Sequence, residues 1–232
     1  MSPPELSVVM PVYNEQDALP EVLAELRAVV LDRIPECELV IVDDHSTDGT
    51  PALLAALDDP RVRVIRAERN RGHGPSVAAA LRAARGEWLL QLDSDAQVVL
   101  EDFWRMWPER EHADLVLGIR RPRHDPAHRL VLSVLLRAVV RVLGRGRGVH
   151  DVNVPFKLLR RELWDRLAPA MPEEPIVPSA LIVLGALRTG ARITEMPIVH
   201  RARSSGTTVL IPTRLLWLSL RAAVELATFR PR

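Results

Sequence analysis

The chain contains very little lysine and very little cysteine. Of its 31 lysine and arginine residues only Lys157 is a lysine, which we interpret as a compositional preference for arginine. The single cysteine, Cys37, excludes an intrachain disulfide and favours a reducing, cytoplasmic location. The formal net charge is only +1, so the strongly basic balance typical of nucleic-acid-binding proteins is missing. We therefore expect no nucleic-acid partner.

Long apolar runs are also missing. Residues 1–15 have no basic segment followed by an apolar core, so we expect no signal peptide. The apolar segment 130–144 carries Arg137 and Arg141 and is too short and too charged for a membrane span. The C-terminal segment 208–229 resembles it. Packing against the core would account for the amphipathic pattern of both helices. A position in a membrane interface would account for it as well, because helices there combine arginine with leucine and tryptophan.

The signatures of two enzyme classes are absent from the sequence. The seven histidines do not have the spacing of metal ligands, and there is no Gly-x-Ser-x-Gly segment. Zinc chemistry and serine-hydrolase chemistry are therefore poorly supported.

The pattern that is present alternates strands and helices. With 47% hydrophobic and 26% charged residues, the 232-residue chain is expected to form one large domain. Strands that are apolar throughout, separated by helices, predict an α/β fold with a parallel sheet covered on both faces. Ligands of such sheets collect beyond the carboxyl ends of the strands. The expected strands are 6–12, 38–43, 61–66, 87–92 and 114–118, and the expected helices are about 15–31, 50–57 and 75–85.

Two acids, Asp93 and Asp95, directly follow the fourth expected strand. Carboxylates this close repel each other and lose hydration unless positive charge lies between them. A solvated turn is one interpretation. The other is a divalent cation, because Mg²⁺ is usually held by one or two carboxylates together with phosphate oxygens. Gln97 would add a neutral oxygen, so this segment predicts an ion site that recruits a diphosphate.

Residues 43–50 follow the second expected strand and precede a helix. Residues 46–48 include candidate caps for that helix. Capping does not explain the two preceding acids, Asp43 and Asp44. We predict that Asp43 accepts hydrogen bonds from a nucleobase or a ribose.

Two other polar segments have competing interpretations. Residues 69–74 resemble the first half of a dinucleotide-binding fingerprint. However, Val77 stands in place of the third glycine, and the segment follows the third expected strand instead of the first. We favour a loop whose amides and arginines face an anion. Residues 200–208 place cations and hydroxyls around Gly206. They form either a solvated loop or a phosphate-binding site.

Taken together, these segments resemble the second family of glycosyltransferases, inverting enzymes of GT-A fold that use nucleotide sugars. Within it the chain most resembles the dolichyl-phosphate mannose synthase-like and polyprenyl-phosphate sugar transferase branch. The resemblance implies a Rossmann-like, mostly parallel central sheet flanked by helices in a domain at 1–207, followed by a C-terminal amphipathic helix at 208–232. The matching segments are 8–15, 40–50, 70–86, 92–97, 151–164 and 190–208.

The resemblance also implies a role for individual residues. The implied donor-binding residues are Pro11, Tyr13, Glu15, Asp43, Asp44, Asp93, Ser94 and Arg120. The implied ligands of Mg²⁺ or Mn²⁺ across the donor diphosphate are Asp93, Asp95 and Gln97. The implied contacts of the acceptor phosphate are Arg201, Arg203 and Thr208. The candidate catalytic residues are Asp95, Arg203 and Asp151, the last of which would contact sugar hydroxyls or act as a general base.

Departures from the family pattern favour one class of acceptor over the others. Thr208-Val209 replaces the usual Ser-Lys, so Arg201 would supply the missing cation, and Pro155 replaces the usual glycine before Phe-Lys. Residues 176–183 lack the acid that many relatives acting on alcohols carry. A phosphate monoester is already anionic at neutral pH and needs no general base. The sequence therefore favours a lipid-phosphate acceptor.

We expect a hexosyltransferase that moves a sugar, with inversion, from a nucleotide-diphosphate sugar to a polyprenyl, dolichyl-type phosphate. Two alternatives remain open: a transferase acting on a hydroxyl of a polysaccharide or glycolipid, and a catalytically silent nucleotide-binding protein. A nucleotidyltransferase would show a glycine-rich basic loop where residues 11–15 read Pro-Val-Tyr-Asn-Glu. We expect a cytoplasmic location, where the protein rests on the cytoplasmic face of a membrane or is recruited there by a membrane-protein partner. The expected partners also include a second copy of the chain in a homo-oligomer.

Overall fold

The computed structural model describes residues 3–121, 127–201 and 212–231. Within these ranges a seven-stranded sheet has the order β3-β2-β1-β4-β6-β5-β7. β1 pairs in parallel with β2 and β4, β2 with β3, and β5 with β7, whereas β6 runs antiparallel to β4 and β5. The mostly parallel sheet predicted from the sequence is confirmed. The strands are β1 Leu6–Val12, β2 Cys37–Asp43, β3 Val62–Arg66, β4 Trp88–Gln91, β5 Leu115–Arg120, β6 Lys157–Arg160 and β7 Ile193–Ile198.

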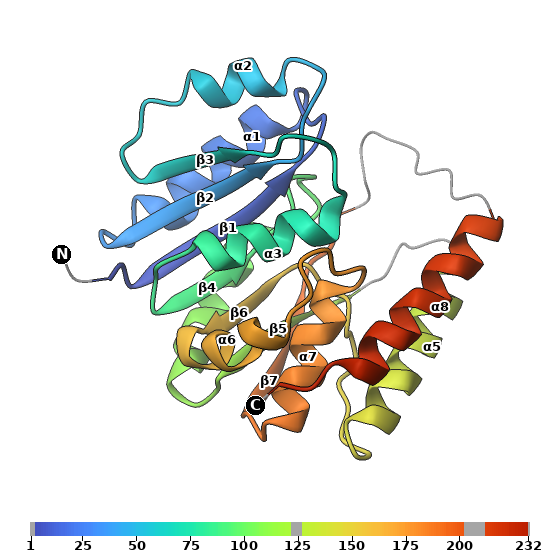
Figure 1. Ribbon diagram of the computed structural model, residues 1–232. Helices are drawn as coiled ribbons and strands as arrows, with labels where there is room; N and C mark the ends of the chain where they lie inside the picture. Colours follow the sequence, from blue (N-terminus) through green and yellow to red (C-terminus); the bar gives the residue numbers. More distant parts are fainter. Residues whose placement is uncertain (1–2, 122–126, 202–211, 232) are drawn as a thin grey trace.

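Helices cover both faces of the sheet (Figure 1). In this view α3, α6 and α7 lie in front of the sheet and α1 lies behind it, while α5 and α8 lie side by side at one flank. The helices are α1 Leu19–Leu26, α2 Thr50–Ala55, α3 His73–Ala83, α4 Phe103–Met106, α5 Ala127–Leu143, α6 Arg161–Leu167, α7 Pro178–Arg188 and α8 Pro212–Thr228. A π-helical turn, Arg27–Leu31, extends α1, so the helix expected near 15–31 is present from Leu19 to Leu31 and begins four residues later than expected.

The expected strands and helices lie close to the observed ones, with two differences. β3 is an edge strand and is only half-buried, with Val64 38% exposed, so it is not apolar on both sides in the way the inner strands are. The strands β6 and β7 were not expected. β6 has only four residues and is inserted antiparallel between two strands that precede it in the chain, an arrangement that no local pattern encodes.

The long helices α5 and α8 have one buried and one exposed face. Val140 of α5 and Leu226 of α8 are buried in the main core, together with Phe229 just beyond α8. Val142 and Leu220, in contrast, are 76% and 65% exposed. Among the described residues no helix combines the length and the apolar character needed to cross a membrane. Core packing therefore explains one face of each helix and leaves the other face open to a partner.

The start of α3 packs closely against the segment before α7. A methyl group on Gly74 would overlap the carbonyl oxygen of Pro175. Glycine is therefore required here by space, because any larger side chain would push the two segments apart.

We predict that Gly74→Ala lowers the free energy of unfolding by about 2 kcal/mol, because the added methyl group overpacks a contact with rigid backbone. Chemical denaturation measures this change. Gly148→Ala is the matched control, because its methyl group would lie 3.4 Å from the side chain of Arg141, an ordinary contact. Equal stability of the two variants would contradict the close packing at Gly74.

Candidate functional site

A cavity of about 420 Å³ opens at the carboxyl edge of the sheet. The loops that follow β1, β2 and β4 and the first turn of α3 contribute its walls, as expected for a parallel sheet. Its lining residues are Pro11, Val12, Tyr13, Glu15, Asp44, Asn70, Gly72, His73, Ser76, Asp93, Ser94 and Asp95. Six of the predicted donor residues, and both predicted metal carboxylates, thus share one cavity.

The loops after β1 and β2 hold each other in place. The side-chain oxygen of Asn14 accepts a hydrogen bond from the backbone N–H of Thr47 at 2.8 Å, and the N–H of Asn14 donates to Ser46 Oγ at 3.0 Å. The N–H of Glu15 donates to Thr50 Oγ1 at 3.0 Å. Tyr13 is left 45% exposed at the cavity. The hydroxyl residues of this segment therefore fix the neighbouring loop, a task the sequence did not indicate.

Asp43 and Asp44 are both buried but have different partners. Asp43 Oδ1 accepts from the N–H of Ser46 at 2.9 Å, and Asp43 Oδ2 lies 3.5 Å from Arg66 Nε. Asp44 accepts the N–H groups of Arg71 at 2.9 Å and Gly72 at 2.7 Å, one on each carboxylate oxygen. Asp44 therefore anchors the loop before α3, where Gly72 takes a φ of 95° that favours glycine.

The first acid of the pair, Asp93, contacts a histidine. Asp93 Oδ1 lies 3.0 Å from His73 Nε2 in the first turn of α3. Burial alone would raise the pKa of Asp93, but the charges of His73 and Lys157 outweigh it and hold that pKa below its ordinary value. Burial likewise opposes protonation of His73, yet Asp93 raises its pKa overall. The ionised carboxylate is therefore the favoured form of Asp93 at neutral pH.

The second acid, Asp95, belongs to a turn that reaches the segment after β7. Asp95 Oδ1 accepts the N–H of Gln97 at 3.2 Å. Gln97 pairs with the backbone of Arg201, whose N–H donates to Gln97 O at 2.7 Å, while Gln97 Nε2 donates to Arg201 O at 3.3 Å. The guanidinium of Arg201 lies 3.8 Å from Glu25. The predicted residues Arg203 and Thr208 lie outside the described residues.

Arg120 and Asp151 form a buried ion pair. Arg120 Nε donates to Asp151 Oδ2 at 2.8 Å and Arg120 Nη2 donates to Asp151 Oδ1 at 3.1 Å, a two-bond geometry that fixes both groups. Asp151 is 3% exposed. Two residues that were predicted to have separate roles are therefore partners, and neither belongs to the lining of the 420 Å³ cavity.

Two residues near the acids were missed as site residues. His73 is the first residue of α3, within a segment that the sequence marked for its glycines, and Lys157 lies in β6. Burial lowers the pKa of Lys157 to about 7, and the charges of Asp93 and Asp151 offset only part of this effect. The sequence signal that could have marked Lys157 as a site residue is that it is the single lysine of the chain.

The donor atoms of the acidic pair suit a hard divalent cation. Within the described residues no group of three or more His, Cys, Asp or Glu side chains converges as a metal site. Asp93 and Asp95 line the same cavity. Two carboxylates are the usual protein contribution where phosphate oxygens complete the coordination of Mg²⁺. The residues present fit such an ion bound together with a diphosphate.

Residues 7–167 match the family described as Glycosyl transferase family 2. The chain belongs to this family. It is 31% identical over 216 residues to an undecaprenyl-phosphate 4-deoxy-4-formamido-L-arabinose transferase of Pseudomonas fluorescens, a match that covers 91% of this chain and 62% of the relative. A protein of the same name from Pseudomonas aeruginosa is 30% identical, with the same two coverages. The chain therefore spans about three-fifths of the length of these family 2 relatives.

Solved structures share the fold of this family 2 chain. Glucosyl-3-phosphoglycerate synthase from Mycobacterium tuberculosis, in complex with Mn²⁺, UDP and phosphoglyceric acid, superposes with a TM-score of 0.70 at 21% identity over 96% of this chain and 77% of its own. S. aureus TarS in complex with UDP-GlcNAc superposes with a TM-score of 0.66 at 22% identity over 98% of this chain and 68% of its own. The expected GT-A architecture is confirmed.

We predict that Asp44→Ala releases the loop at residues 69–72, because two backbone N–H groups lose their acceptor at a cost of about 1–3 kcal/mol. Hydrogen–deuterium exchange should show faster exchange of the Arg71 and Gly72 amides. The control is Asp58→Ala at an exposed position, which should leave these amides unchanged. Unchanged protection of the loop in Asp44→Ala would contradict the anchoring role.

Proposed function

We propose that this chain transfers a glycosyl group from a nucleotide-diphosphate sugar to a polyprenyl phosphate, with inversion at the sugar carbon. The observation that carries the proposal is the meeting of Asp93 and Asp95 with Tyr13 and Glu15 in one cavity at the carboxyl edge of the sheet. The proposal specifies no hexose, because the relatives are named for a modified L-arabinose, which is a pentose.

The donor would occupy this cavity. Pro11, Tyr13 and Glu15 would contact the nucleotide, while Asp43 would read the base or the ribose. Asp44 would act by holding the loop at residues 69–72 against the donor, because both of its oxygens accept backbone N–H groups of that loop. Preorganised donor-binding loops reduce the entropy cost of binding.

The diphosphate would be held at the acids. Asp93 and Asp95, with Gln97 beside them, would bind Mg²⁺ or Mn²⁺, and Ser94 would lie against the phosphates. The bound ion would neutralise the diphosphate as it leaves the sugar. The Mn²⁺ and UDP held by glucosyl-3-phosphoglycerate synthase support this assignment by likeness of fold.

The state of Asp151 supports a phosphate acceptor. A general base must be able to reach and take a proton, whereas both oxygens of Asp151 accept hydrogen bonds from Arg120 and the group is 3% exposed. An anionic phosphate monoester attacks without such a base. In this proposal Arg203 would be the catalytic contact of that phosphate, with Arg201 and Thr208 beside it, and Asp151 would orient Arg120.

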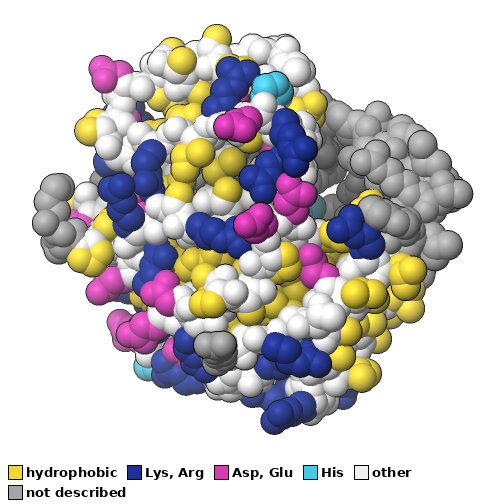
Figure 2. Space-filling view, viewed as in Figure 1, with side chains coloured by type: hydrophobic (Ala, Val, Ile, Leu, Met, Phe, Trp, Pro, Cys, Tyr) yellow, Lys and Arg dark blue, Asp and Glu magenta, His cyan; other side chains and the backbone are white. Residues whose placement is uncertain are grey.

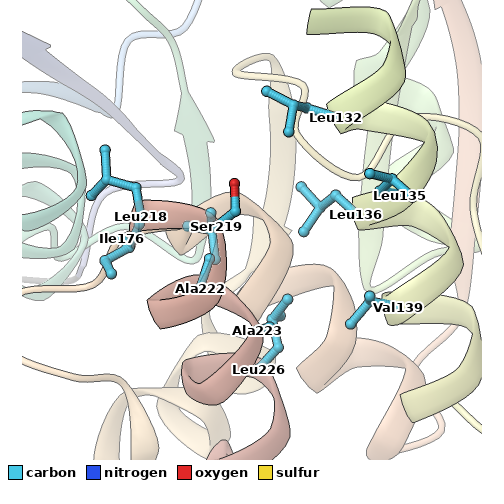
Figure 3. A pocket seen from close by; sticks show the side chains of 11 residues that line it. Leu132, Leu135, Leu136, Val139, Ile176, Leu218, Ser219, Ala222, Ala223 and Leu226 are labelled. Atoms are coloured by element: carbon cyan, nitrogen blue, oxygen red, sulfur yellow. The ribbon is translucent and has the colours of Figure 1, made fainter. Parts of the chain in front are cut away.

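An apolar groove on the flank supports a lipid acceptor. The groove has a volume of about 260 Å³ and is lined by residues of α5 and α8 together with Ile176 and Val177. Figure 3 shows Leu132, Leu136 and Val139 of α5 on one side and Ser219, Ala222 and Ala223 of α8 on the other, with Leu218 beside Ile176. The relatives named above carry undecaprenyl phosphate in their names. A polyprenyl chain has the apolar character that this groove would accept.

The outer surface of the same two helices supports a position on a membrane. Figure 2 shows hydrophobic side chains gathered on the flank where α5 and α8 lie in Figure 1. The exposed large residues of this flank are Val134, Leu135, Val142, Leu220 and Val224. Arg137, Arg141 and Arg221 are exposed beside them, and arginine next to apolar residues suits an anionic lipid surface. Attachment through this flank would bring the acceptor to the enzyme.

We predict that Asp95→Asn lowers transfer at least about 100-fold, because the ion and the leaving diphosphate lose a charged ligand. The measurement is nucleotide release from a panel of sugar nucleotides with undecaprenyl phosphate and Mn²⁺. Asp58→Asn, at an exposed position, is the control and should keep full activity. Wild-type turnover in Asp95→Asn would contradict the metal role, and turnover only with a hydroxyl acceptor would redirect the proposal to that acceptor class.

We predict that Leu220→Glu combined with Val224→Glu lowers vesicle binding at least about tenfold, because each lost apolar contact is worth roughly 1.5 kcal/mol. Flotation with phosphatidylglycerol and phosphatidylethanolamine vesicles measures the bound fraction. Ala52→Glu, at an exposed position of α2, is the control and should bind like the wild type. Equal flotation of the double variant and the wild type would rule out this flank as the membrane surface.

A further inference from the structure

Lys157 is the first residue of β6, an inner strand of the sheet, and is completely buried. Its strand, β6, lies between β4 and β5, and in the register Lys157 is opposite Gln91 on one side and Leu117 on the other. β4 leads to Asp93 two residues after Gln91, while β5 ends at Arg120. Lys157 therefore lies between the two strands that carry the acidic pair and the Arg120–Asp151 pair.

The ammonium group of Lys157 interacts with polar groups that belong to the strand ends around the site. Nζ donates a hydrogen bond to Gln91 Oε1 at 3.2 Å. The carboxylates of Asp93 and Asp151 attract the ammonium, and the guanidinium of Arg120 opposes them. The adjoining residues of β6, Phe156 and Leu158, are fully buried and apolar. The charge of Lys157 is thus buried, and the carboxylates of Asp93 and Asp151 act on it electrostatically.

Packing alone does not account for a lysine here. Burial of an ammonium group costs free energy unless opposite charge compensates it, and an apolar side chain of similar length would fill the same space without that cost. The rest of the chain uses arginine as its basic residue. A guanidinium is larger and carries five N–H donors that a closed site must satisfy, whereas an ammonium is a compact point charge. Position 157 is therefore distinguished by a compact, buried positive charge on a side chain.

We propose that Lys157, in its protonated ammonium form, is a positioning residue that acts as a counter-charge for Asp93 and Asp151 and weakens the binding of a divalent ion in the absence of the diphosphate. The ammonium repels an ion at the acidic pair and attracts the diphosphate. Binding of the ion together with the diphosphate is therefore favoured over binding of the ion alone. This inference rests on the proposed function for the identity of the ligands.

The test measures the affinity for Mn²⁺ in the absence of nucleotide. Electron paramagnetic resonance gives the concentration of free Mn²⁺ in each sample. Lys157→Met removes the charge at similar length, and we expect it to bind Mn²⁺ about tenfold more tightly than the wild type, since a nearby like charge is lost. With Mn²⁺ saturating, its affinity for UDP should fall by a similar factor. A packing defect would weaken both ligands, so opposite changes identify the charge effect.

Two further variants keep the test decisive if Lys157→Met does not fold. Lys157→Arg keeps the charge in a larger group, so it should not tighten Mn²⁺ binding in the way Lys157→Met does. Gln91→Glu keeps the lysine but places a carboxylate where Oε1 accepts its hydrogen bond, so it should tighten Mn²⁺ binding as Lys157→Met does. Unchanged or weaker Mn²⁺ binding in both Lys157→Met and Gln91→Glu would overturn the proposal.

Asp95→Asn separates this inference from the proposed function. If Asp95→Asn binds Mn²⁺ as the wild type does, the acidic pair is not the ion site and the proposed function fails. If Asp95→Asn loses the ion while Lys157→Met and Gln91→Glu leave its affinity unchanged, the ion site stands and only the role of Lys157 is wrong.

Discussion

Two carboxylates one residue apart can end a buried strand only where positive charge compensates them. In this chain the compensation of Asp93 comes from three separate elements: His73 at the start of α3, Lys157 in β6 and Arg120 at the end of β5. The three cations repel one another, so it is their shared attraction to the carboxylate that offsets the cost of placing them together. The edge of the sheet, the cavity and the chemistry proposed for it all depend on this balance of charge.

The scaffold around the cavity is built from contacts between loops. Asp44 fixes the loop before α3, and Arg71 of that loop lies 3.2 Å from Glu174. Two residues further on, the N–H of Ile176 donates to Glu225 of α8 at 3.1 Å. Residues 173–177 thus connect the donor cavity to the apolar flank. The two substrates of the proposed reaction would therefore bind to one continuous framework.

Local patterns were sufficient for much of this protein. The apolar runs of β1, β2, β4 and β5 and the amphipathic α1 and α3 were predicted close to their observed bounds, because burial on both faces and helical periodicity leave direct marks in the sequence. The expectation that ligands collect beyond the carboxyl ends of the strands agrees with the cavity there, which Asp93 and Asp95 share with Tyr13.

The sequence by itself determined the fold class, the family and the edge of the sheet at which the polar segments meet. Tertiary structure alone decided where β6 lies, since antiparallel pairing depends on strands distant in the chain, and with it the placement of Lys157 beneath the acids. It also decided that Asp151 pairs with Arg120 and that Asp44 holds a loop. Partners of a buried charge are chosen in three dimensions, because compensation depends on distance through space and not on separation along the chain.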